Sequence, residues 1–173
     1  MTLRKILLHP DPRLKRICEP VAEVTEAVAK LAEDMLQTMY DAPGVGLAAP
    51  QIGITKRLLV MDCTDKEEED ARPMVLINPE VTWTSEATNT YEEGCLSIPD
   101  FYGDVTRPKS VRVAFLDEKG HQREEVFDDL WATCVQHEID HLNGKLFIDY
   151  LSLVKRQMIT TKMKKIKKER ARA

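Results

Sequence analysis

The sequence predicts an α+β fold, with mixed or antiparallel sheets packed around a central helix that carries an HExxH motif, and with a further helix at the C-terminus. Strand-like runs fill the middle of the chain, helical spacing of apolar residues marks its ends, and short turns between the strands favour antiparallel pairing. With 173 residues and 43% hydrophobic content, the chain suits one domain, which we expect to span residues 1–173.

The first predicted helix covers residues 26–40. Thr25 is a suitable N-cap, and apolar side chains recur at steps of three and four residues as far as Met39, which places them on one face. The helix ends at DAPGVGLAAPQIG, residues 41–53. Two prolines and three glycines there predict a loop without regular structure, shaped for close approach to another group.

The middle of the chain contains short runs of β-branched, aromatic and aliphatic residues, separated by charged or turn-forming segments. Such runs predict strands of a sheet with short connections. The predicted strands are residues 57–62, 74–77, 81–84, 111–116 and 123–127.

From Asp128 the apolar spacing becomes helical again, and it ends at the stop signal Asn143-Gly144. This predicted core helix carries QHEIDH, in which His137 and His141 lie one helical turn apart and can both face one ion. Glu138 beside them completes the HExxH pattern of metal hydrolases. On the motif alone, a chance occurrence on an ordinary core helix is the alternative.

A catalytic metal site usually has three protein ligands and one position for water. The best candidate for the third ligand is Cys95 in EEGCLSIP, where Gly94 leaves the backbone room and a thiolate offers a strong, soft ligand. The competing interpretation is a small buried apolar side chain, which is the usual fate of a free cysteine.

Charge is distributed unevenly along the chain. Residues 155–173 contain nine Lys or Arg and one acidic residue, a charge of +8, so the overall −4 leaves −12 on the remainder. Ser152 can cap this segment, and residues 152–173 are predicted to form a basic C-terminal helix. We also expect a cytoplasmic protein that does not enter membranes, because no long apolar run is present and prolines 10 and 12 interrupt the N-terminal segment.

Three motifs, GVGLAAPQIG, EGCLS and QHEIDH, resemble in order and separation those of the peptide deformylases, and the likeness extends from HPDPRL to the helix after LFIDYL. The resemblance implies removal of the formyl group from N-formyl-methionine of nascent polypeptides by one divalent metal ion. It implies metal ligands Cys95, His137 and His141, a general base and acid, Glu138, and oxyanion donors in the Gln51 side chain and the Leu96 backbone N–H. Ferrous iron is the implied native ion, with zinc, nickel and cobalt as alternatives.

Substrate contacts also follow from the resemblance. The peptide and its methionine are expected to contact Val45, Gly46, Tyr91, Gly94, Leu130, Cys134 and the face of His137. Two features depart from the family pattern: Thr133 stands where a bulky aliphatic residue is common, and DFYGDV lacks an arginine found in many members. Arg107 and Asp140 could pair to steady the HExxH helix, or form a surface ion pair.

The expected partners are formylated nascent peptides and the ribosome, which the basic C-terminal helix would contact near the exit of the nascent chain. We expect a monomer. A function of another class is a non-catalytic protein of the same fold that binds RNA or the ribosome through this helix, although Glu138, Gln51 and Cys95 argue against it. The competing interpretation of the helix itself is a solvated, charged face.

Overall fold

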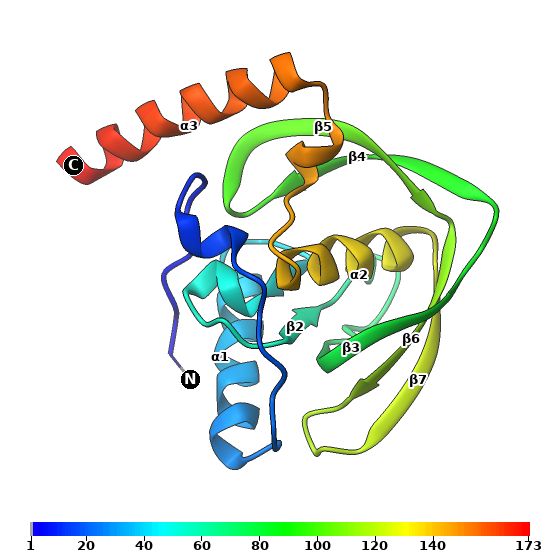
Figure 1. Cartoon of the computed structure of the whole chain (residues 1–173). Coiled ribbons are helices and arrows are strands. Elements are labelled where there is room, and N and C mark those ends of the chain that lie inside the picture. The colour runs from blue at the N-terminus through cyan, green and yellow to red at the C-terminus, as the bar shows by residue number, and fades with distance from the viewer. Residues whose placement is uncertain (1) are drawn as a thin grey trace.

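The computed structural model describes residues 2–173 and contains two antiparallel sheets and three α-helices (Figure 1). The larger sheet has the order β1-β2-β3-β6-β7, and the smaller is the hairpin β4-β5. The predicted α+β class is confirmed. The strands are β1 (Gly46–Ala48), β2 (Leu58–Met61), β3 (Met74–Thr84), β4 (Thr88–Cys95), β5 (Ile98–Pro108), β6 (Ser110–Leu116) and β7 (Gln122–Asp128).

The helices begin where the sequence predicts them. In α1 (Glu26–Asp41), the Thr25 hydroxyl accepts a hydrogen bond from the Val28 N–H at 3.4 Å, and α2 (Asp129–Leu142) follows β7 directly. In α3 (Leu153–Arg172), the Ser152 hydroxyl accepts from the Lys155 N–H at 3.2 Å. These hydroxyls satisfy backbone donors that have no partner within the first turn.

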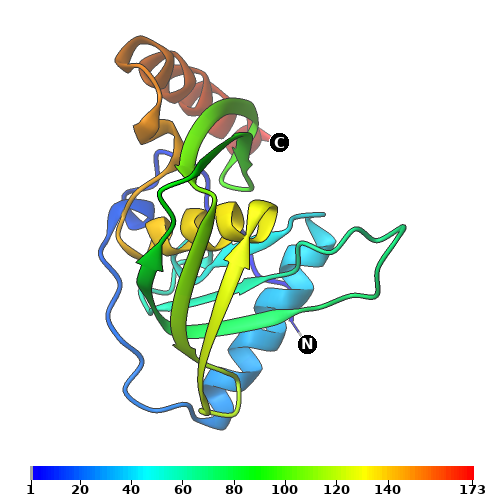
Figure 2. The same cartoon turned by 90° about the vertical axis from the view of Figure 1, so that its right-hand side faces the viewer.

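The larger sheet separates α1 from α2 (Figure 2). Alternation along β2 explains this layering: Leu59 and Met61 belong to the core cluster that includes α2, whereas Leu58 and Val60 pack in the cluster that includes α1. On its other side α2 meets β5, so it is covered by both sheets. A central helix buried in this way can hold polar side chains away from bulk water.

Two predictions about the strands were wrong. Residues 41–53 are not wholly irregular, because β1 pairs with β2 and a 3-10 turn, Ala49–Ile52, follows it. Residues 74–77 and 81–84 are parts of one strand, since β3 continues through a register irregularity at Asn78, whose φ is 50°. The hairpin β4-β5 lies outside the predicted strands altogether.

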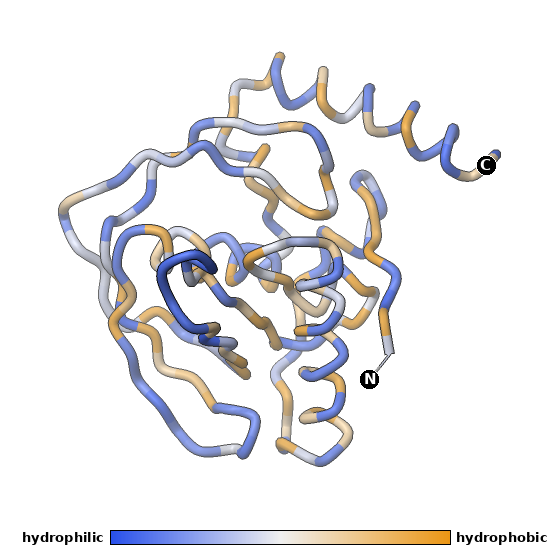
Figure 3. The backbone as a smooth tube through the Cα atoms, turned by 180° about the vertical axis from the view of Figure 1, so that it is seen from behind, coloured by the Kyte–Doolittle hydropathy of each residue, from blue (hydrophilic) through white to orange (hydrophobic). Residues whose placement is uncertain are grey.

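The C-terminal helix is attached to the body by few side chains. Ile159 and Met163 are buried in a third core cluster with Phe147, Ile148 and the strand β5, while the remainder of α3 is largely exposed. Figure 3 shows that most of α3 is hydrophilic. None of the helices within residues 2–173 combines the length and the apolar character that crossing a membrane requires.

Candidate metal centre

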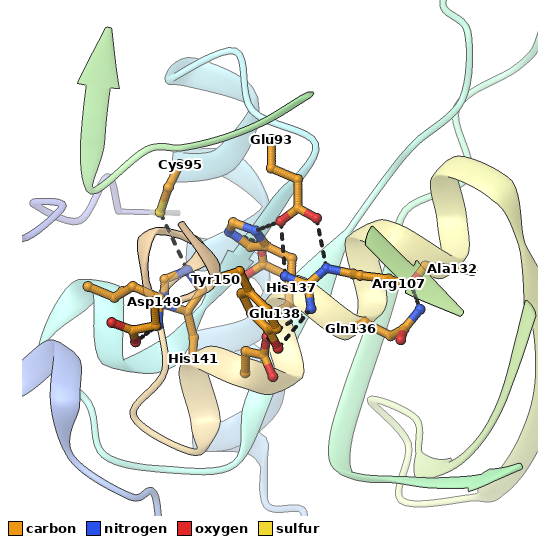
Figure 4. Close-up of polar contacts among 12 residues, drawn as sticks. Glu93, Cys95, Arg107, Ala132, Gln136, His137, Glu138, His141, Asp149 and Tyr150 are labelled. Carbon is orange, nitrogen blue, oxygen red and sulfur yellow. Dashed lines mark hydrogen bonds and ion pairs between the residues drawn. The ribbon is translucent and has the colours of Figure 1, made fainter. Parts of the chain in front are cut away.

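Three potential metal ligands from two different elements meet beside α2. His137 and His141 lie one turn apart on that helix with ring centroids 5.0 Å apart, and Cys95 ends β4 with its Sγ 3.4 Å from His141 Nε2 (Figure 4). One ligand atom from each residue lies within 4.8 Å of the other two. The structure thus brings together the three residues that the sequence indicated as ligands.

A hydrogen bond with Glu93 on β4 fixes the orientation of the His137 ring. Glu93 Oε1 lies 2.9 Å from His137 Nδ1, which leaves Nε2 turned towards Cys95 and His141. A carboxylate in this position is a common outer partner of a metal-binding histidine. Burial alone would raise the pKa of Glu93, but hydrogen bonds from His137 and Arg107 hold it below its usual value.

Arg107 links this carboxylate to α2. Its Nε and Nη2 donate to the two Glu93 oxygens at 2.7 and 3.0 Å, and its Nη1 donates to Asp140 Oδ2 at 2.8 Å (Figure 4). The guanidinium also lies over the Tyr150 ring. Arg107 is only 4% exposed, so its ion pair with Asp140 lies inside the protein and helps to hold α2 in place. The alternative interpretation, an ion pair on the surface, is wrong.

Glu93 is a residue of the site that was not predicted from the sequence. Beside Glu92 it resembles one more surface carboxylate of a charged segment. A signal was nevertheless present, because residues 93 and 95 are two apart on a strand and therefore project from the same face. A carboxylate two positions before a candidate cysteine ligand can reach a histidine bound to the same ion.

Glu138 lies beside the cluster in a dry environment. It is 3% exposed, its Oε1 is 3.8 Å from His137 Nε2, and its Oε2 has no hydrogen-bond partner among the described residues. Burial raises the pKa of Glu138 to about 7. A carboxylate with this pKa can exchange a proton with a neighbouring group near neutral pH.

The cluster has the chemistry that a divalent metal requires. Burial lowers the pKa of His141 well below its usual value, so its imidazole is neutral and able to donate a lone pair. Burial also disfavours a charge on His137, but Cys95, Glu93 and Glu138 together raise its pKa well above normal. The pocket therefore favours a positive charge at its centre.

Gln51 is held beside Cys95 by the 3-10 turn after β1. Its Oε1 accepts from the Ala48 N–H at 2.9 Å, and its Nε2 lies 3.1 Å from Ser97 Oγ and 3.5 Å from Cys95 Sγ. The first bond fixes which end of the amide faces the cluster, so that the NH₂ group points towards Cys95. Gln51 is 1% exposed, and a surface amide is therefore excluded.

A cavity of about 480 Å³ opens beside the cluster and reaches Glu138, Gln51 and Leu96. A side chain at Gly46 would place its Cβ 2.7 Å from Glu138 Oε1 and 2.9 Å from Cys134 Sγ, so these two side chains would have to shift to admit it. Thr133 and Tyr102 also line the cavity. Its walls contain every residue that the sequence resemblance suggested for substrate binding: Val45, Gly46, Tyr91, Gly94, Leu130 and Cys134.

A Cys-His-His cluster with an adjacent buried carboxylate, set in an open cavity, defines a metal-dependent hydrolase. The profile of the family described as Polypeptide deformylase matches residues 3–157. The chain belongs to this family.

Individual relatives cover nearly the whole chain. Peptide deformylase from Bartonella henselae is 54% identical over 98% of this chain and 96% of its own length. That of Afipia carboxidovorans is 55% identical, with 97% and 98% covered. The crystal structure of a peptide deformylase from Legionella pneumophila matches with a TM-score of 0.90 at 46% identity over 99% of both chains.

A crystal structure of peptide deformylase from Ehrlichia chaffeensis in complex with actinonin matches with a TM-score of 0.91 at 39% identity, covering 95% of this chain and 98% of that one. These comparisons give no support to the alternative of a non-catalytic RNA-binding protein.

Proposed function

We propose that this chain hydrolyses the formyl group from N-formyl-methionine at the start of nascent polypeptides, as one catalytic domain spanning residues 1–173. The observation that carries the proposal is the set of three ligand atoms within 4.8 Å, next to the buried Glu138. Cys95, His137 and His141 would hold one divalent ion. That ion, when bound, supplies an acidified water whose pKa falls from about 15.7 towards 7.

Glu138 is the proposed proton carrier. Its unpartnered Oε2 takes the proton of the attacking water, and the same carboxyl group returns it to the departing amine nitrogen. A pKa of about 7 suits both steps, because the group is then near the midpoint of its titration in neutral solution. The buried position keeps the carboxylate from being solvated by competing waters.

Gln51 and Leu96 are the proposed donors to the formyl oxygen as it becomes negative. The Gln51 amide is held in place before the substrate arrives, since its oxygen is already bound to the Ala48 N–H. Preorganised donors of this kind are worth about 3 kcal/mol each in other enzymes. Leu96 contributes its backbone N–H, so a side-chain change there would test packing rather than this bond.

The peptide is proposed to bind as an additional strand. β1 is an edge strand of the larger sheet, and Gly46 of β1 and Gly94 of β4 both line the cavity. An extended substrate can pair with such an edge through its backbone, while its methionine enters the pocket at Leu130 and Cys134. Thr133 adds a polar group to that pocket, so we expect weaker discrimination against slightly polar first residues.

The test is a deformylation assay on a formyl-Met peptide under anaerobic conditions, with bound metal quantified in the same preparation. Glu138→Gln should keep the metal and lose about 10²–10⁴-fold in kcat, because the amide cannot take up the proton. Glu124→Gln, an exposed carboxylate on β7, is the matched control and should be fully active. Normal turnover in Glu138→Gln would remove this residue from the mechanism.

Ferrous iron is the proposed native ion, supported by the family and by the thiolate and imidazole donors, which also accept zinc, nickel and cobalt. The iron form should lose activity in air as the metal and the Cys95 thiolate oxidise, whereas the nickel form should persist. Equal half-lives of the two forms in air would contradict this assignment.

We further propose that the enzyme is a cytoplasmic monomer and that residues 152–173, its basic C-terminal helix, contact ribosomal RNA. The nine basic residues after position 154 support this, since lysines and arginines that bind phosphates release counterions. Deleting residues 162–173 would also remove the buried Met163, so substitution is the cleaner test.

Three exposed lysines of α3 can be changed together to glutamine. Sedimentation with ribosomes should weaken and lose its salt dependence, while hydrolysis of a short formyl-Met peptide stays unchanged. Salt-sensitive ribosome binding that survives the change would contradict the proposed docking. The lysines to change are Lys162, Lys165 and Lys168, and the control set is Lys30, Lys66 and Lys119.

A further inference from the structure

A second cavity, of about 510 Å³, lies between α3 and the N-terminal segment, apart from the metal centre. On the body it is lined by His9, Lys15 and Ile148, and on α3 by Arg156, Thr160 and Lys164. The three α3 residues are spaced four apart, so they project from the same face of the helix towards the body. Figure 1 shows the C-terminal half of α3 extending over the N-terminal segment.

The walls of this cavity are positively charged. Its lining contains Lys15, Arg156 and Lys164 and, within residues 2–173, no acidic side chain. Arg156 is 3.6 Å from Asp149, whereas neither lysine forms an ion pair with any described residue. The three cations outnumber this one carboxylate and still repel one another, and an anion between them would relieve that repulsion.

His9 holds one hydroxyl group of the cavity wall in place. The residue is 2% exposed, and its Nε2 lies 2.8 Å from the Thr160 hydroxyl, whereas Nδ1 has no partner among the described residues. Burial and the nearby Lys15 lower the pKa of His9 to about 4, so the ring is neutral at pH 7. If Nε2–H donates to the Thr160 hydroxyl, the proton of that hydroxyl is free to be donated into the cavity.

We propose that this cavity is a binding site for a phosphate group, held by Lys15, Lys164 and Arg156 with hydrogen bonds from the hydroxyls of Thr160 and Thr161. Phosphate matches the lining because it carries up to two negative charges and several acceptor oxygens, whereas the walls offer several cations and hydroxyl donors. The volume also admits a phosphate monoester. The site is independent of the proposed deformylation.

The site lies between the N-terminal segment and α3, whose apolar side chains belong to the same third core cluster. Lys15 and His9 belong to the N-terminal segment, whereas Lys164 is in the half of α3 that lies beyond most of its buried contacts. A bound phosphate would therefore fasten α3 to the body. An indirect chain of contacts leads from this site towards the metal centre, because the His9 N–H donates to the Ser97 carbonyl at 2.9 Å and Ser97 Oγ accepts from the Gln51 amide.

Titration calorimetry of the full chain with inorganic phosphate, at constant ionic strength, tests the proposal. We expect one saturable site. Lys15→Gln and Lys164→Gln should each weaken it about 10-fold or more, since each removes a charged hydrogen bond to the anion. Lys162→Gln and Lys165→Gln are the matched controls on the same helix and should bind as the unchanged protein does.

A second measurement does not depend on the lysine variants. Saturating phosphate should move the imidazole resonances of His9, identified by their absence in His9→Gln, while those of the exposed His121 stay in place. A parallel titration with a nucleoside 5′-monophosphate distinguishes the source of the ligand: tighter binding than phosphate indicates an ester, and weaker binding indicates the free anion.

Three results would overturn the proposal. The first is no saturable binding of either probe below about 10 mM. The second is equal weakening in the control variants, which would indicate general attraction to a basic helix. The third is phosphate binding without any change at His9, which would place the anion elsewhere.

Discussion

Replacing Glu93 by glutamine is the sharpest test of how the metal centre is held. The carboxylate receives three hydrogen bonds, one from His137 at 2.9 Å and two from Arg107 at 2.7 and 3.0 Å. Glutamine keeps the shape but offers one oxygen and an NH₂ group. At least one Arg107 N–H then faces another donor, and the charge of a buried ion pair is lost.

The loss of these interactions sets the expected change in stability. Breaking a buried ion pair by neutralising one partner costs about 3–5 kcal/mol, and Asp140 retains a part of the Arg107 interaction, so we expect about 3 kcal/mol of unfolding free energy. Loss of the carboxylate behind His137 should weaken metal binding by about 10–100-fold, because the ring is less basic and less firmly oriented.

Two assays separate these effects. Urea unfolding of the metal-free protein measures stability, and competition with a chelator measures metal affinity. Glu92→Gln, an exposed carboxylate on the same strand, is the control and should change neither value. A Glu93→Gln protein that lost less than about 1 kcal/mol, the range of a surface ion pair, and kept its metal affinity would refute the inferred support.

Three further outcomes are expected. Cys95→Ala should abolish stoichiometric metal binding, as measured by metal analysis after gel filtration, and full retention would contradict its assignment as a ligand. Gly46→Ala should reduce kcat/KM for formyl-Met peptides at least about 10-fold with metal content unchanged, because the new Cβ would lie 2.7 Å from Glu138 Oε1. The His9 pKa of about 4, below the unfolded value of 6.5, predicts stability that is fully present above pH 6.5 and is lost as pH falls towards 4, by about 3 kcal/mol in total. Urea unfolding at several pH values should show this loss in the unchanged protein, and in His9→Gln it should be smaller.

Local patterns predicted the helices, and long-range pairing accounts for what was missed. Thr25 and Ser152 mark helix starts because capping acts within three residues, and the spacing of His137 and His141 is a property of one turn. By contrast, β4 and β5 carry polar residues on much of both faces, so their alternation is weak and only their mutual pairing defines them. The Asn78-Pro79 pair is typical of a strand end, yet the pairing of β3 with β6 continues past it.

The same limit applies to the site. Its ligands could be proposed from the sequence because a motif resemblance joined Cys95 to the HExxH helix. Glu93 belongs to no such motif, and it can contact His137 only because the fold brings β4 next to α2. The interior position of Arg107 could not be read from the sequence either, because a charged residue among strands is normally exposed.

The cavity walls come from segments near residues 45, 93 and 134, which reach one another only through the paired strands and α2. No contiguous fragment of the chain contains the proposed base, the oxyanion donors and all three ligands without most of the fold between them. Catalysis should therefore behave as an all-or-none property of the domain, appearing in refolding experiments only with the last cooperative step. Recovery of turnover after dilution from denaturant would thus report the completion of folding more strictly than circular dichroism, which registers helices that form early.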